Sequence, residues 1–148
     1  MINLHTPEPL IEEHQAFCDE LLKAIDTGGN LGIIAKEIEN LLNPHFRIEE
    51  ESVFPPLTLM APLSRGELDP AMKGALNIIE RSKNELPKLT NDHLEIIQML
   101  KNFDEAMVAE KKIVFAQFSQ KLIHHAKAEE FILYPAVILI GELLKLKL

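Results

Sequence analysis

Apolar residues recur at intervals of three or four positions through most of this 148-residue chain, and that interval is typical of amphipathic α-helices. Breaks in the pattern fall at Gly28-Gly29, over residues 61–69 and before Lys111. We therefore predict four helices with short connections, which favour an all-α, up-down-up-down four-helix bundle. The predicted helices run from Pro7 to Gly28, from Asn30 to Pro55, from Pro70 to Met107 and from Lys111 to Tyr134.

Three of these helices have a recognisable start. Thr6-Pro7 and Asp69-Pro70 each place a capping side chain before a proline in the first turn. Asn30 is positioned to cap the second helix. These caps set the expected boundaries.

Two prolines conflict with the helical pattern. Pro44 and Pro87 fall inside predicted helices, where a proline removes a hydrogen bond and costs about 3 kcal/mol. The apolar pattern continues on both sides of each. We expect a kink at Pro44, and at Pro87 either a kink or a division of the third helix.

Composition and charge exclude several classes of protein. Hydrophobic residues make up 47% and charged residues 26%, which fits a single globular domain over residues 1–148. The net charge of −8 disfavours a nucleic-acid partner, because phosphates attract basic surfaces. A single cysteine, Cys18, cannot form an internal disulfide. With neither a secretory signal nor an apolar run of ~18 residues, we expect no membrane contact and a cytoplasmic location.

The last predicted helix is followed by an apolar segment from Ala136 to Leu146. This segment is long for a solvated tail, since exposed apolar surface of that extent usually covers something. Two interpretations remain open. The segment packs on the bundle, or it forms the contact between two copies in a homodimer.

The second half of the chain repeats the first. The pattern H-x3-E-E-x3-(F/Y)-P begins at His45 and again at His125, an offset of 80 residues that also relates Glu49 to Glu129. His14 and His93 are separated by 79 residues, almost the same step. The chain is therefore expected to have an internal pseudo-two-fold repeat, each half contributing a lone histidine and an H-x3-E pair.

This spacing predicts that the repeated residues meet in the bundle. Residues i and i+4 lie on one face of a helix, so His45 and Glu49 point the same way, as do His125 and Glu129. His14 and His45 both lie about 22 Å along their helices from the first turn, and the two later histidines lie about 24 Å from theirs. All four histidines are thus expected at one level.

The residues next to these motifs are expected to point elsewhere. Glu50 and Glu130 are rotated by about 140° from the preceding histidine of their motif, which predicts that they face solvent. His124 is badly placed to share the face of Glu129 and is expected not to be a ligand. Cys18 lies one turn after His14, either as a small core residue or near the pocket.

Buried histidines and carboxylates surrounded by leucine and isoleucine need charged partners, and metal cations supply them. Two cations bridged by two glutamates, with two histidines on each, would leave open positions for an oxygen bridge and a small ligand. The candidate ligands are His14, His45, Glu49, His93, His125 and Glu129.

With His14, His45-x3-Glu49, His93 and His125-x3-Glu129, the sequence resembles the haemerythrin-like family, the HHE cation-binding domain. The resemblance implies a four-helix bundle with a non-haem di-iron centre. Its two iron ions would be joined by Glu49 and Glu129 and by an oxo or hydroxo bridge.

The oxygen-carrying members differ from this chain in two motifs. They have a second histidine on the third helix, where this chain has Ile97, and a five-residue His-to-Asp spacing that His124 and Glu129 could imitate. The set of four histidines and two glutamates is closer to the subgroup implicated in repair of nitrosatively damaged iron centres.

Binding or sensing of O2 or NO is the leading interpretation, because the expected site is rich in nitrogen ligands and lies in an apolar pocket. Iron donation to damaged iron–sulfur centres is a second. Iron oxidation or storage is a third, although the E-x2-H pairs of ferritin-like sites are absent from the sequence. A metal-free interaction module is a fourth. No nucleophile–base motif indicates a catalytic residue, so the sequence does not decide whether the protein is an enzyme.

Overall fold

The computed structural model describes residues 3–148, and in that part of the chain every regular element is helical. The prediction of an all-α fold is confirmed. Turns of 3₁₀ and π geometry join the α-helices. The α-helices are α1 (Glu8–Asp26), α2 (Gly29–Ile48), α3 (Met60–Ser64), α4 (Ala75–Ala109), α5 (Phe118–Ala128) and α6 (Tyr134–Lys147).

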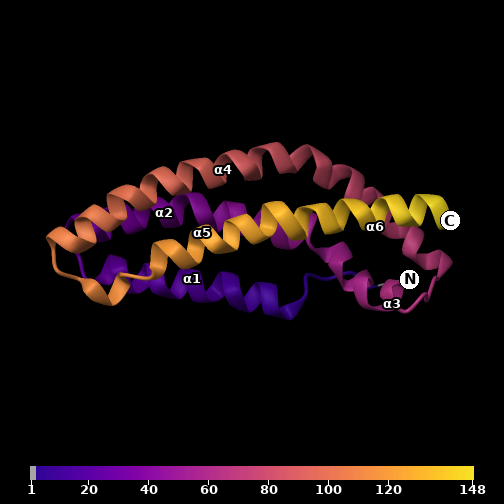
Figure 1. Cartoon of the computed structure of the whole chain (residues 1–148), viewed down its shortest axis with the longest axis horizontal. Coiled ribbons are helices and arrows are strands. Elements are labelled where there is room, and N and C mark those ends of the chain that lie inside the picture. Colours follow the sequence, from indigo (N-terminus) through magenta and orange to yellow (C-terminus); the bar gives the residue numbers. More distant parts are fainter. Residues whose placement is uncertain (1–2) are drawn as a thin grey trace.

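The long helices lie along the longest axis of the molecule. In Figure 1, α1, α2, α4 and the continuous run of α5 and α6 extend beside one another, and α3 lies at the end where the chain terminates. The α1–α2 and α4–α5 turns share the opposite end, and hydrogen bonds join them. Glu110 Oε2 accepts from the Leu31 N–H at 2.9 Å, and Lys112 Nζ donates to the Gly28 carbonyl at 2.9 Å.

Two apolar clusters form the core, on either side of the level at which the motif histidines lie. One cluster, including Phe17, Ile38 and Phe103, lies toward the two turns. The other, including Ile79 and Val137, lies toward the C-terminal end of α6. The polar motifs are therefore enclosed by apolar residues at both ends.

The structure corrects two of the expected caps. Thr6 does not cap α1, which begins after Pro7; its hydroxyl instead donates to the Glu50 carbonyl at 2.7 Å. Asn30 lies inside α2 and does not cap it. The Leu31 N–H in the first turn of α2 donates instead to the side chain of Glu110, at the end of α4. In both cases a contact distant in sequence replaces the local cap. The Asp69 cap is confirmed, because its side chain accepts from the Ala71 N–H at 2.9 Å.

Neither internal proline interrupts its helix. Pro44 lies within α2, and Pro87 lies within the 35 residues of α4, which is bowed but continuous in Figure 1. Division of the helix at Pro87 is thus wrong, because packing on both sides outweighs the loss of one hydrogen bond. Residues 60–64 form α3 and are not part of a loop. The helical run of α2 continues through a π-turn at Glu49–Val53 and stops before Pro55, as predicted.

The apolar C-terminal segment is helix α6. Val137, Ile140 and Leu144 are buried against the bundle, and a Cβ at Gly141 would lie 2.7 Å from Ile79 Cγ2, so α6 approaches α4 closely. Packing on the bundle is therefore confirmed. The opposite side of α6 is exposed and also apolar.

Within residues 3–148, no helix has both the length and the apolar composition required to cross a membrane.

Candidate metal centre

Each H-x3-E motif ends in a turn of π-helix. The turns cover Glu49–Val53 and Glu129–Leu133, so each begins at the motif glutamate. The Phe54 N–H donates to the Glu49 carbonyl at 2.8 Å, five residues back, and Tyr134 does the same to Glu129. Such π-turns frequently occur at functional sites. The sequence repeat is therefore also a repeat of local backbone structure.

Glu49 connects two histidines from different helices. Its Oε1 lies 3.2 Å from His14 Nε2, and its Oε2 lies 3.3 Å from His45 Nε2. All three side chains are buried, with exposed fractions of 2% or less. One carboxylate thus spans the gap between α1 and α2.

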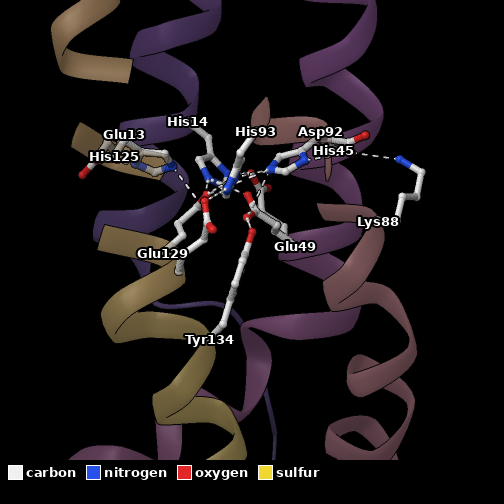
Figure 2. A network of polar contacts seen from close by, with 12 residues as sticks. Glu13, His14, His45, Glu49, Lys88, Asp92, His93, His125, Glu129 and Tyr134 are labelled. Carbon is white, nitrogen blue, oxygen red and sulfur yellow. Dashed lines mark hydrogen bonds and ion pairs between the residues drawn. The ribbon is translucent and has the colours of Figure 1, made fainter. Parts of the chain in front are cut away.

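Glu129 makes the equivalent contacts on the other side. Its Oε2 lies 2.9 Å from His125 Nε2, and its Oε1 lies 3.0 Å from His93 Nε2. Figure 2 shows the four imidazoles and two carboxylates converging at one level of the bundle. The structure therefore brings together all six residues that the sequence identified.

The donor atoms form two groups of four, and both glutamates belong to each group. Within each group the atoms lie within 4.8 Å of one another, and every residue is buried. We call the group with His14 and His125 the His14 position, and the group with His45 and His93 the His45 position. Two cations held this way would share both carboxylates.

His124 and Cys18 lie outside both groups. The His124 side chain is exposed, in agreement with the prediction that it is not a ligand. Cys18 Sγ lies 3.6 Å from Asn43 Oδ1, in a surface groove of about 340 Å³ beside His14. Its thiol faces that groove and not the centre.

Glu50 and Glu130 correct the sequence prediction, because neither faces solvent freely. Glu50 Oε2 lies 2.7 Å from His14 Nδ1, and Glu130 Oε2 lies 2.8 Å from His93 Nδ1. The expected rotation assumed that α-helical geometry continues past the motif. In the wider π-turn each residue rotates less, so the second glutamate reaches a histidine on the neighbouring helix.

The other two histidines have carboxylate partners that sequence reasoning missed. His45 Nδ1 lies 3.0 Å from Asp92 Oδ2, and His125 Nδ1 contacts Glu13 Oε1. Asp92 also accepts from Lys88 Nζ at 2.9 Å. The signal was in the sequence, since an acidic residue directly precedes each lone histidine.

Every candidate ligand histidine therefore has a carboxylate on Nδ1 and directs Nε2 at the centre. An acceptor on Nδ1 fixes the tautomer and orientation of an imidazole and makes Nε2 a better metal ligand. This arrangement is characteristic of histidines that hold metals. It also explains why the repeat includes the residues adjacent to the ligands.

Tyr134 is a further residue of the centre that the sequence did not identify. Its hydroxyl donates to Glu49 Oε2 at 2.5 Å, and its ring stacks parallel to His93, with centroids 6.1 Å apart. Burial, and then the charge of Glu49, raises the pKa of the phenol well above its usual value, so it remains a donor. The repeat places Phe54 at the matching position, 80 residues earlier.

When no cation is bound, protons on the histidines balance the negative charges of the glutamates. Burial would lower the pKa of His14 and His45, but interactions with Glu129 and Glu49 outweigh it and raise both pKa values to about 10. Burial would raise the pKa of the Glu129 carboxyl, but hydrogen bonds from the histidines hold it well below its usual range. The centre therefore favours positive charge.

Buried polar atoms that make no hydrogen bond indicate that the residues of the centre fit metal cations. Glu49 Oε1 and His125 Nε2 both belong to the His14 position and are buried, and among the described residues neither makes a hydrogen bond of good geometry. Their contacts, to His14 Nε2 at 3.2 Å and to Glu129 Oε2 at 2.9 Å, are ion-pair contacts only. Unpaired buried polar atoms are costly, and a cation bound there would pair both. Two imidazoles and two carboxylate oxygens per position suit iron and related transition metals.

A family model described as the Hemerythrin HHE cation binding domain matches residues 5–137. The chain belongs to the hemerythrin HHE family. This match covers all six candidate ligands, and the family's cation-binding character agrees with the buried His/Glu groups. No match was found among curated proteins or among solved structures.

Proposed function

We propose that the chain is a non-haem di-iron protein that binds or senses O2 or NO, with two iron ions in an up-down-up-down four-helix bundle. His14 and His125 would hold one ion and His45 and His93 the other, with Glu49 and Glu129 joining them. When bound, the iron pair supplies the redox electrons and the open coordination positions. The chain supplies the ligands, their orientation and the exclusion of water.

The observation that supports this proposal best is the sharing of both glutamates by two groups of four donors. Four protein donors per ion leave coordination positions free, as in iron sites that take up small ligands. A bridging oxo or hydroxo group and one diatomic molecule would fill them.

The walls of the centre suit a small, neutral ligand. Phe46 stacks on His14 with ring centroids 3.8 Å apart, and Phe54 and Tyr134 lie on the other side of the centre. Each of these aromatic side chains is at most 4% exposed. Apolar gases partition into such surroundings more readily than ions do.

The proposal is tested by adding O2 or NO to the anaerobic Fe²⁺-loaded protein in a stopped-flow spectrophotometer. We expect a visible absorption band to form rapidly with each bound gas. The same experiment on a Glu129→Gln variant should show no band. Slow bleaching or oxidation with no such band in the parent protein would contradict gas binding.

Iron donation to damaged iron–sulfur centres is a second candidate, supported by the position of the centre near the surface. The His14–Glu50 pair lines the 340 Å³ groove between α1 and α2, and Glu13, which holds His125, is half-exposed. Iron could leave by this side without unfolding the bundle. Faster transfer to an apo iron–sulfur acceptor than to a chelator would favour this function over gas binding.

We further propose that the exposed side of α6 joins two copies of the chain. Leu139 and Leu146 on α6 are 66% and 83% exposed, and Phe131 in the turn before α6 is 78% exposed. A contiguous apolar surface on a helix is typical of a protein–protein contact. Sedimentation of the parent protein should show a dimer, and Leu139→Glu should shift it to a monomer. If Leu139→Glu left the mass of the assembly unchanged, this surface would not be the dimer contact. Leu94→Glu is the matched control, because Leu94 is also exposed but lies on α4.

A further inference from the structure

Two hydrogen-bond donors break the two-fold symmetry of the centre, and both act at the His45 position. Tyr134 occupies the place that Phe54 has in the first half of the repeat. Lys88, one turn before Asp92, corresponds to Pro9. The ligands and their carboxylate partners are otherwise repeated.

Tyr134 acts on the oxygen that a cation at the His45 position would use. Glu49 Oε2 faces His45, and the Tyr134 hydroxyl donates to this oxygen at 2.5 Å. The bond occupies one of its two lone pairs and brings a partly positive hydrogen toward the cation. No hydroxyl among the described residues donates to Glu49 Oε1, which lies 3.2 Å from His14 Nε2.

Lys88 acts on the same position from outside. Its ammonium donates to Asp92 Oδ2, the oxygen that also holds His45 Nδ1, as Figure 2 shows. Because the Asp92 carboxylate is shared with the Lys88 ammonium, it polarises the His45 imidazole less, and His45 becomes a weaker metal ligand. No lysine or arginine forms an ion pair with Glu13 or Glu50, which hold the histidines of the His14 position, among the described residues.

The hydrogen bonds between the ligand atoms also favour a cation at the His14 position over one at the His45 position. At the His45 position, His93 Nε2 already lies 3.2 Å from His45 Nε2 and 3.0 Å from Glu129 Oε1, and a cation must replace both hydrogen bonds. At the His14 position the one hydrogen bond between ligand atoms among the described residues, from His14 to Glu129, is long at 3.5 Å. Glu49 Oε1 and His125 Nε2 make ion-pair contacts there, at 3.2 Å and 2.9 Å, without the geometry of a hydrogen bond. A cation therefore gains more at the His14 position.

We propose that the two positions are filled in order, the His14 position first, and that Tyr134 and Lys88 are the positioning residues that weaken the His45 position. This inference rests on the proposed two-metal centre. A single ion would then occupy one defined position, and the complete centre would form only when metal supply is sufficient. Partners of metal-binding histidines change affinity by about 10-fold to 100-fold, so we expect the two dissociation constants to differ by about tenfold.

The order is tested by titrating the metal-free protein with Co²⁺ and following its visible absorption. Two steps of one ion each are expected in the parent protein. His125→Ala should remove the tighter step, and His93→Ala should remove the weaker one. Loss of the tighter step in His93→Ala, or uptake of both ions in a single step, would overturn the proposed order. Fewer than two ions in total would instead contradict the di-metal centre itself.

Two conservative variants test the cause without removing a ligand. Tyr134→Phe and Lys88→Met should each strengthen the weaker step several-fold, by about the effect of one outer hydrogen bond, and leave the tighter step unchanged. Lys83→Met is the matched control, because Lys83 is also on α4 but pairs with Glu80 and Glu142. A weaker second step in Tyr134→Phe would show that the tyrosine supports the His45 position, and the inference would be wrong.

Discussion

The Glu129→Gln variant is expected to lose both metal ions, not one. Glu129 is shared by the two positions, and it contacts His14 and His125 through Oε2 and His93 through Oε1. An amide has the same size as the carboxylate but no charge, so it cannot neutralise or bridge two cations. Iron content should fall from about two ions per chain, one for each position, to close to none.

Anaerobic reconstitution with Fe²⁺, followed by elemental analysis, measures this loss. Glu39→Gln is the matched control, because Glu39 is also buried in a helix but pairs with Lys36 outside the centre. It should retain both ions. His45→Ala should lose at least the ion at the His45 position. Two ions retained in Glu129→Gln would mean that this glutamate does not bridge, and zero ions in the parent protein would favour a metal-free interaction module.

The sequence was sufficient to predict the helices and the convergence of the six candidate ligands. Helical periodicity fixes which side chains share a face, so His45 and Glu49 had to point together wherever the helix packed. The level of each histidine followed from its distance to the nearest turn. These are properties of single helices and of their connections, which a sequence determines directly.

The carboxylate partners could not be predicted in the same way. Glu13 precedes His14 but contacts His125 on another helix, and Asp92 precedes His93 but contacts His45. A residue next to a ligand points about 100° away from it, so its partner depends on which helix lies alongside. Periodicity within one helix does not indicate which helices lie side by side.

Backbone geometry explains the remaining differences. The π-turns at both motif glutamates are not visible in an α-helical pattern, and they place Glu50 and Glu130 against histidines. The replacement of the expected Asn30 cap by Glu110 has a similar origin, since the two residues are 80 positions apart and meet only when the bundle forms. In each case tertiary contacts overrode a local rule.

Between about pH 6.5 and 10 the metal-free protein is expected to lose stability, while the stability added by bound metal is expected to grow. Without metal, the pKa of His14 and His45 is raised from 6.5 to about 10, so the charged imidazoles stabilise the folded state. That contribution is fully present below pH 6.5 and is lost as the pH rises toward 10. The melting temperature of the metal-free protein should therefore fall across this interval.

The stability added by metal has the opposite pH dependence, because a cation and a proton compete for the same Nε2 atom. Each proton that is displaced makes the affinity rise about tenfold per pH unit. At a free metal concentration of about 1,000 times the dissociation constant, binding adds about 4 kcal/mol, or on the order of 10 °C in melting temperature. This increment should grow from pH 6.5 to pH 9, while the metal-free protein becomes less stable.

Scanning calorimetry of the protein with and without Co²⁺, at several pH values, measures both slopes. Glu129→Gln is the informative variant, since it removes the carboxylate that raises the pKa of His14 and His45 and the ligand that holds both ions. It should flatten the metal-free slope and abolish the stabilisation by metal together. A metal-free protein that gains stability toward pH 9 would show that its histidines are neutral. The carboxylates of the centre would then be balanced by something other than imidazole protons.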